Sequence, residues 1–152
     1  MTHPSQSGSA APHTEIDVAI LGAGPAGLMA AEVLSRAGVA VHVFDAMPSA
    51  GRKFLLAGKG GLNLTHAESL ERFVTRYGAA QARIEPWLRD FGPAALRDWA
   101  AGLGIDTFVG SSGRVFPLDL TAAPLLRGWV RRLRAQGVRF HVSHRWRGFG
   151  DD

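Results

Sequence analysis

The sequence predicts an α/β fold built around a parallel sheet, and three observations near its start support this. Residues 16–21 (IDVAIL) are a short apolar run rich in β-formers, residues 28–37 (LMAAEVLSRA) have the composition of a helix, and residues 39–44 (VAVHVF) are a second apolar run. Gly38 follows the helical stretch in the position of a C-terminal cap. A strand, a helix and a strand in this order form a βαβ unit, whose two strands lie parallel.

A glycine-rich turn joins the first predicted strand to the helix. Its spacing is G-x-G-x-x-G, in which the first glycine permits a tight turn, the second lets a pyrophosphate approach the backbone and the third lets helix and strand pack closely. The start of the helix adds free N–H groups and the positive end of its dipole. The turn therefore predicts a Rossmann-like dinucleotide-binding domain. Its residues are Gly22, Ala23, Gly24, Pro25, Ala26 and Gly27.

Asp45 follows the second predicted strand, where such folds place an acidic residue. Its carboxylate can accept hydrogen bonds from both ribose hydroxyls of an adenosine, and an aspartate there argues against a 2′-phosphate. The glycine motif alone does not separate NAD from FAD. Pro25 favours FAD, because GAGPAG is common among flavin enzymes.

The remainder of the chain predicts further elements of the same domain. We expect helices at residues 68–77, 83–91 and 93–101, and short strands at 105–109 and 114–116 around a turn at 110–113. Helix 121–136 is the clearest, with Thr121 as its N-cap and Gly137 as its stop. Strand 138–143 alternates apolar and polar residues and would be a third strand of the nucleotide fold. Because no repeat or linker divides residues 15–152, we predict one domain.

The composition restricts the class of protein. Hydrophobic residues make up 46% and charged residues 20% of the chain, as in ordinary globular proteins, and no apolar stretch reaches the roughly 20 residues that cross a bilayer. Residues 1–14 are small and polar, which predicts a disordered arm and not a secretory signal. The lack of cysteine excludes disulfides and thiolate metal sites and fits a cytoplasmic protein. No histidines have convincing metal-ligand spacing, so we expect no metal. The lack of an apolar span predicts no membrane partner.

A basic block lies near the end of the sequence. From Arg127 to Arg147 there are seven arginines and no acidic residue. Such a block can form a surface for nucleic acid or another anion, or the solvated side of a helix and a strand. We prefer the solvated surface and expect no nucleic-acid partner, because the sequence has no helix-turn-helix, RNP-like or zinc motif.

Several motifs together resemble the BaiN-like flavoproteins, FAD-dependent oxidoreductases that include aminoacetone oxidase family FAD-binding enzymes. The motifs are GAGPAGLMAA (22–31), D-x-x-P-x-x-GRK (45–53) and GKGGLNLTH (58–66). SGRVFP (112–117) and APLLRGW (123–129) are similar to the same family. The resemblance extends over residues 15–150 and so covers nearly the whole chain.

The resemblance implies an extended FAD with adenosine at Asp45, pyrophosphate at the first glycine turn, and flavin beside a second glycine-rich loop in residues 51–66. Arg52 and Lys53 would meet phosphate or the N1–C2=O edge of reduced flavin, while the end of the loop offers further donors. The residues predicted to bind FAD are Gly22, Ala23, Gly24, Pro25, Ala26, Gly27, Asp45, Ala46, Gly51, Arg52, Lys53, Gly60, Gly61, Asn63, Leu64, Thr65 and Trp146.

A substrate pocket is implied by the same resemblance. Arg114 would bind an anionic group of the substrate and Phe116 would form a wall beside the flavin, and His66 is the histidine that we expect in the pocket. The sequence assigns no catalytic residue. Leu62 stands where many family members have a cysteine, which argues against a thiol-dependent step, and Thr121 takes the place of a frequent lysine.

The functional prediction is the FAD-binding part of an oxidoreductase that passes hydride between a small organic substrate and FAD, with NAD(P)H as a candidate electron donor. Family members are much longer than 152 residues. The resemblance therefore implies an incomplete, N-terminal part of a flavoprotein, without later strands or a substrate domain, and we expect this part alone to bind FAD weakly and to be inactive. An NAD-binding dehydrogenase would explain the first glycine turn but not the second loop. An arginine-rich nucleic-acid-binding module is a more distant alternative.

Overall fold

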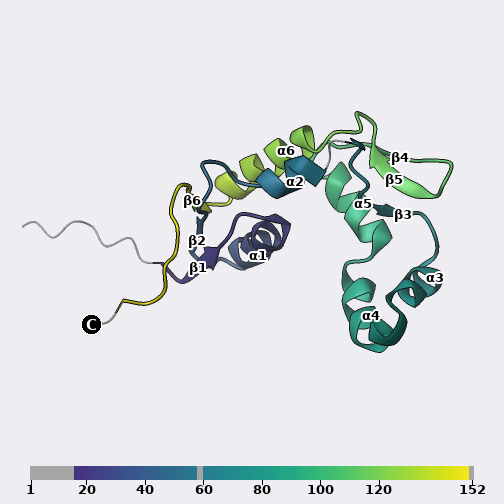
Figure 1. The fold of residues 1–152 in the computed structure, drawn as a ribbon, viewed down its shortest axis with the longest axis horizontal. Coiled ribbons are helices and arrows are strands. Elements are labelled where there is room, and N and C mark those ends of the chain that lie inside the picture. Colours follow the sequence, from purple (N-terminus) through teal and green to yellow (C-terminus); the bar gives the residue numbers. More distant parts are fainter. Residues whose placement is uncertain (1–15, 58–59, 151–152) are drawn as a thin grey trace, which may run out of the picture.

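A computed structural model describes residues 16–57 and 60–150. The arm predicted at residues 1–14 lies outside the described residues. Two small sheets lie toward opposite ends of the described structure, joined by helices (Figure 1). We call the first, with its helices, the parallel unit and the second, with its helices, the antiparallel unit.

The parallel unit contains the predicted Rossmann-like sheet. Its strands are β1 (Val18–Leu21), β2 (Val41–Phe44) and β6 (Arg139–His141), in the order β1-β2-β6. Both pairings are parallel, with Val18 opposite Val41 and His42 opposite Arg139. The two predicted apolar runs and the third strand are therefore confirmed, each a few residues shorter than expected. This is a Rossmann-like α/β arrangement.

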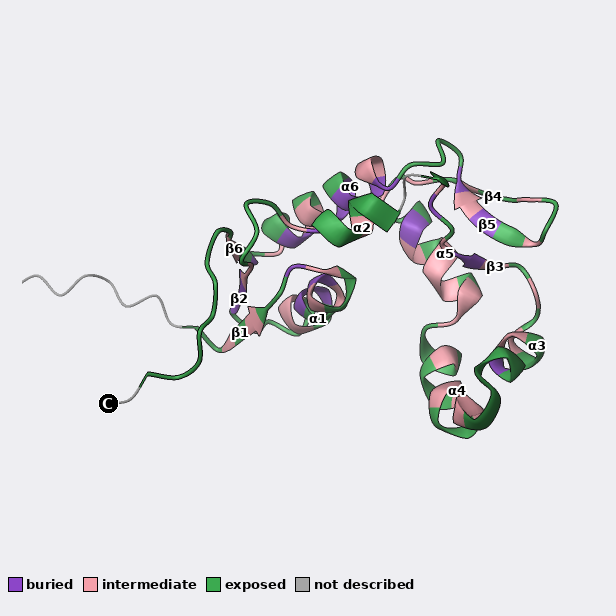
Figure 2. Ribbon diagram, in the orientation of Figure 1, coloured by how far each residue is buried: buried purple, intermediate pink, exposed green. Residues whose placement is uncertain are grey.

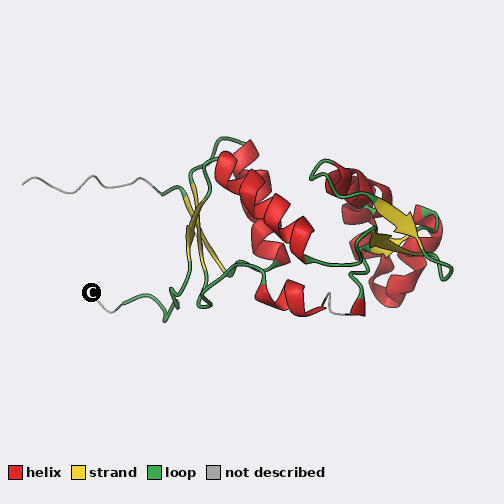
Figure 3. Cartoon of the chain, turned by 90° about the horizontal axis from the view of Figure 1, so that it is seen from above, coloured by secondary structure: helices red, strands yellow, loops and turns green. Residues whose placement is uncertain are grey.

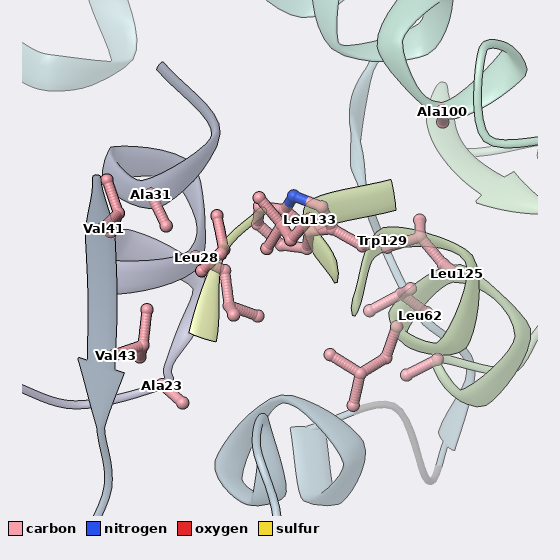
Figure 4. Packing of buried hydrophobic residues seen from close by; sticks show 13 residues of the cluster. Ala23, Leu28, Ala31, Val41, Val43, Leu62, Ala100, Leu125, Trp129 and Leu133 are labelled. Atoms are coloured by element: carbon pink, nitrogen blue, oxygen red, sulfur yellow. The ribbon is translucent and has the colours of Figure 1, made fainter. Parts of the chain in front are cut away.

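Two helices cover one side of this sheet (Figure 3). Helix α1 (Pro25–Arg36) connects β1 to β2, and helix α6 (Ala123–Ala135) leads into β6. Their apolar faces bury Leu28 and Leu133 completely against Val41 and Val43 (Figure 4). Burying each side chain of this size contributes about 1.5–3 kcal/mol. The hydrophobic core therefore lies between the sheet and these two helices.

The antiparallel unit holds the chain between β2 and α6. Its sheet has the order β3-β5-β4, made of β3 (Thr65–His66), β5 (Arg114–Pro117) and β4 (Thr107–Val109). Its helices are α3 (Leu70–Val74), the 3-10 helix η2 (Thr75–Ala80), α4 (Gln81–Asp90) and α5 (Pro93–Ala101). The predicted strands at 105–109 and 114–116 exist, but they form this separate sheet together with β3.

Two predictions about local structure are wrong. Residues 51–66 are not one open loop, because Arg52–Ala57 form helix α2, whose sequence RKFLLA consists largely of good helix formers. Thr121 is not the N-cap of α6, since Ala122 occupies that position without a side-chain hydrogen bond. The Thr121 hydroxyl instead donates to Asp119 Oδ2, at 3.4 Å.

One buried carboxylate joins the two units. Glu32 on α1 is 1% exposed, and its Oε2 accepts hydrogen bonds from Trp129 Nε1 at 2.7 Å and from Trp99 Nε1 at 3.1 Å. Its Oε1 accepts from Arg132, at 3.0 Å, and from Arg36, at 2.6 Å. Because Trp99 belongs to α5, this carboxylate fixes the antiparallel unit against α1 and α6. Burial alone would raise the pKa of Glu32, but the bonds from Trp99 and Arg132 and the charge of Arg36 together lower it.

Candidate dinucleotide-binding site

The glycine turn lies at the carboxyl ends of β1 and β2. Gly22 has a φ of 102° and donates its N–H to the Phe44 carbonyl at 2.7 Å. At Gly27 a Cβ atom would lie only 2.0 Å from the Gly22 carbonyl oxygen and 3.2 Å from Ile20. Only glycine at this position therefore lets α1 pack this closely on β1.

The outer side of the same turn is open. A Cβ atom at Gly22 or Gly24 would meet nothing within 4 Å. The first helical hydrogen bond of α1 is donated by Leu28 to Gly24, so the N–H groups of Ala26 and Gly27 precede it. The first turn of α1 carries no acidic side chain and no side-chain cap. The turn thus offers backbone donors and the helix dipole beside free space, which suits a diphosphate.

Asp45 holds the turn in place. Its Oδ2 accepts the Ala23 N–H at 2.6 Å, and its Oδ1 accepts the Met47 N–H at 2.8 Å. Its own backbone N–H donates to His141 of β6, and its carbonyl accepts from His144. Each carboxylate oxygen can accept a second hydrogen bond, so the bonds from Ala23 and Met47 leave Asp45 able to bind a ribose. The sequence did not indicate the bond from Ala23, because it joins residues far apart in the chain.

The second predicted loop meets the first at Gly51. Its N–H donates to the Ala23 carbonyl at 2.9 Å, and a Cβ atom on it would lie 2.6 Å from Leu126 of α6. Arg52 and Lys53 follow in the first turn of α2, and both are exposed. Gly58 and Lys59 lie outside the described residues. The two glycine segments are therefore adjacent at Gly51, although much of the second is helical.

Other predicted residues gather in a cavity of about 500 Å³ in the antiparallel unit. From the prediction, the lining includes Asn63, Leu64, Thr65, His66 and Arg114. Side chains that the sequence did not indicate complete it, among them Phe73, Arg76, Tyr77 and Phe91. They come from α3, from η2 and, in the case of Phe91, from the end of α4, and they were missed because no motif marks them.

The other residues of the second loop lie nearby. Phe116 does not line this cavity; its ring lies 5.8 Å from that of Phe108 and faces Gly61, whose Cβ would be 3.8 Å away. Gly60 is exposed, and Leu62 is 5% exposed and belongs to the hydrophobic core. Leu62 is thus a packing residue.

His66 lies in the wall of this cavity and connects two segments by hydrogen bonds. Its Nε2 lies 3.0 Å from the Ser112 carbonyl, which only accepts, and its Nδ1 lies 3.3 Å from the Glu68 N–H, which only donates. These partners fit the neutral Nε2–H tautomer. Glu68 also pairs with Arg76, and the hydrogen bond from Arg76 is the main reason that the pKa of Glu68 is lowered. His66 therefore links β3 to the turn before β5.

Trp146 lies beside a second cavity, of about 580 Å³, on the sheet face that the helices leave uncovered. Leu21 and Phe44 form its floor, and His144 and Phe149 contribute to its walls. The Trp146 side chain is 55% exposed, and its ring lies 5.8 Å from that of Phe149. Since Phe44 directly precedes Asp45, this aromatic cavity adjoins the residue predicted to bind the ribose. Ala46 is exposed at the same edge.

The predicted site residues thus form two groups. The first glycine turn, Asp45, Ala46, Gly51 and Trp146 lie in or next to the parallel unit. Asn63, Thr65, His66 and Arg114 lie together in the antiparallel unit. Within the part of the chain that the structure describes, no three histidine or acidic side chains gather as a metal site, and no helix is long and apolar enough to span a bilayer.

A comparison with known families shows the class of this domain. The sequence profile of the HI0933-like protein Rossmann domain matches residues 16–152. The chain belongs to this family. HI0933-like Rossmann domains are FAD-binding, so the dinucleotide fold described above is that of a flavoprotein domain.

Solved structures agree with the HI0933-like fold. Thermovibrio ammonificans THI4 shares 19% identity with a TM-score of 0.53, and the match covers 84% of this chain and 38% of that one. The 3-ketosteroid-Δ4-(5α)-dehydrogenase from Rhodococcus jostii RHA1, solved with 4-androstene-3,17-dione, shares 19% identity with a TM-score of 0.60, over 89% of this chain and 40% of that one. The chain therefore spans about two fifths of each. No curated protein sequence gives a significant match.

Proposed function

We propose that this HI0933-like chain is the FAD-binding portion of a BaiN-like, flavin-dependent oxidoreductase that acts on a small organic substrate. One observation carries the proposal: the bond from Gly51 to Ala23 brings the second glycine segment against the diphosphate turn. An NAD-binding dehydrogenase needs only the turn and Asp45. A cofactor that extends from Asp45 past both glycine segments uses every part of this arrangement.

The residues present fit such a cofactor. The N–H groups of Ala26 and Gly27 would hold the pyrophosphate in the open space outside Gly24, and the Asp45 carboxylate would accept from the ribose hydroxyls. The aromatic cavity beside Trp146 is suited to the planar adenine. When bound, FAD supplies a ring that takes up or releases hydride.

Charge near the second segment would assist both binding and electron transfer. Arg52 and Lys53 are exposed in the first turn of α2, where two cations oppose the helix dipole. Their position is therefore not explained by helix stability, and it favours contact with phosphate or with the anionic edge of a reduced ring.

The cavity beside β3 and β5 is the proposed substrate site. Arg114 would bind an anionic group of the substrate, while Asn63 and Thr65 would orient the molecule by hydrogen bonds. NAD(P)H is the proposed electron donor. We assign no catalytic residue, and we expect the 152-residue chain alone to show no turnover.

A cofactor titration tests the proposal. We expect the purified chain to bind added FAD, measured by quenching of flavin fluorescence, and to bind NAD⁺ more weakly. Gly24→Ala places a methyl group where the pyrophosphate would approach but contacts no protein atom, so FAD affinity should fall at least about tenfold. Because Gly24 is the N-cap of α1 and alanine is a poorer cap, the melting temperature should fall only slightly. Gly150→Ala is the matched control, because its Cβ would also meet nothing within 4 Å. Preference for NAD⁺, or unchanged FAD binding by Gly24→Ala, would contradict the proposal.

A further inference from the structure

A groove of about 630 Å³ runs between α6, β6 and the start of α2. Its floor is apolar and is formed by Leu55, Leu126, Val130, Phe140 and Val142. Leu55 and Val142 remain 38% and 37% exposed. None of the residues of the first glycine turn, and neither Asp45 nor Trp146, lines this groove. The groove is therefore separate from the first glycine turn and Asp45, and it adjoins the second glycine segment, because Ala50 and Leu55 of its lining flank Gly51, Arg52 and Lys53.

Part of the arginine block forms one rim of the groove. Arg127, Arg131 and Arg134 lie on α6 with spacings of four and three residues, so they share one face of the helix. At about 1.5 Å of rise per residue, the row is about 10 Å long. All three residues are exposed. Figure 2 shows exposed residues along α6.

In the described part of the chain, Arg127 and Arg131 lack the acidic partners that several other arginines have. Arg36 and Arg132 pair with Glu32, Arg72 and Arg76 pair with Glu68, and Arg89 pairs with Glu85. Among the described residues, Arg127 and Arg131 form no ion pair. Arg134 places its guanidinium 5.7 Å from the centre of the Phe140 ring. The groove lining contains no acidic residue to balance this row.

We propose that this groove binds an acidic amphipathic helix of a partner protein. Such a helix presents carboxylates at positions i, i+4 and i+7, which match the arginine row, and its adjoining apolar residues fill the strip from Leu55 to Val142. Nucleic acid would satisfy the arginines through its phosphates but would leave the apolar floor unused. The combination of a charged rim and an apolar floor therefore favours an acidic amphipathic helix over nucleic acid.

A binding experiment with the full chain tests this proposal. The probe is a fluorescein-labelled helical peptide with glutamates at i, i+4 and i+7 and leucines on the adjoining face, and binding is followed by fluorescence anisotropy. We expect the peptide to bind, and a scrambled peptide of the same composition to bind at least about tenfold more weakly. The double variant Arg127→Glu/Arg131→Glu should also weaken binding about tenfold or more.

Matched variants separate the groove from general charge. Arg83→Glu/Arg147→Glu makes the same change in net charge at exposed arginines outside the groove and should keep peptide affinity within about twofold. Leu55→Ser should weaken binding of the amphipathic peptide, because it removes an apolar contact from the floor of the groove. Circular dichroism verifies folding, and Arg131→Gln replaces the double variant if that fails to fold.

Three results would overturn the proposal. They are no binding of the amphipathic peptide, equal binding of the scrambled peptide, and equal loss with both double variants. Single-stranded DNA is titrated in parallel. If DNA binds through Arg127 and Arg131 while the peptide does not, the groove is a nucleic-acid surface instead.

Discussion

The two sheets of this chain have the same number of strands but are held together in different ways. The parallel sheet is covered by two helices and buries Val41, Val43, Leu28 and Leu133 to 2% exposure or less. In the antiparallel sheet Val115 and Pro117 are buried to that extent, both on β5, and polar contacts such as that of His66 with Ser112 connect β3 to the turn before β5. The parallel unit is thus stabilised mainly by apolar packing, whereas hydrogen bonds connect the elements around the cavity of the antiparallel unit.

The two units meet at Glu32, and this gives the largest expected effect. In Glu32→Ala, four hydrogen-bonding partners lose their acceptor, including the indoles of Trp99 and Trp129. Removing one side of a buried ionic network costs about 3–5 kcal/mol. Urea unfolding should therefore show this loss of stability. Glu32→Gln, which keeps the shape and one acceptor, should lose less.

The outcome also tests whether the units are coupled. Because Trp99 reaches Glu32 from the antiparallel unit, hydrogen exchange in Glu32→Ala should accelerate in α5 as well as in α1 and α6. Faster exchange confined to α1 would contradict a joint role for this carboxylate.

A smaller effect is expected inside the antiparallel unit. Gly113 has a φ of 78°, and a Cβ atom there would lie 2.5 Å from the His66 ring, so Gly113→Ala should displace the ring from Ser112. Gly104→Ala is the matched control, since Gly104 has a φ of 77° but no atom within 4 Å of the added carbon. We expect Gly113→Ala to cost about 1–3 kcal/mol more than the control in thermal unfolding. Equal losses would show that His66 does not depend on this space.

The smallest expected effect is a pH dependence of the stability that Glu32 contributes. The pKa of Glu32 in the folded chain lies below its ordinary value of 4.5, so folding favours the ionised carboxyl. Its contribution is therefore complete at neutral pH and is lost as the pH falls through the folded pKa, below 4.5. The stability difference between the natural chain and Glu32→Gln, measured by urea unfolding, should be constant from pH 7 to 5 and should shrink below that range. A difference that grows in acid would have the wrong sign.

Sequence reasoning worked best where structure is decided locally. The apolar runs of β1 and β2, the glycine turn and the helix after it are set by residues within one βαβ unit. The strand β3 was missed because it has only two residues and pairs with β5, far along the chain. No motif in the sequence marks Glu32, because Trp99, Trp129 and Arg132, which bond its carboxylate, come from α5 and α6.

The candidate site divides in the same way. Gly27 and Asp45 follow from a local motif, whereas the cavity lined by Arg76, Tyr77 and Arg114 exists only because η2 and β5 meet in space. Arginine spacing on α6 was visible in the sequence. The apolar floor beside it was not, because Phe140 and Leu55 reach it from two other segments.

The order β1-β2-β6 has a consequence for how this architecture tolerates change. The antiparallel unit lies between β2 and β6 in the sequence, yet β6 pairs directly with β2. The entropy of closing such a long excursion rises only with the logarithm of its length, by about 0.6 kcal/mol for each doubling. Parts of the excursion that lie away from Trp99 and α6 can therefore gain or lose residues at little thermodynamic cost to the parallel sheet. Residue changes around the cavity beside β3 and β5 are therefore expected to disturb the parallel sheet little.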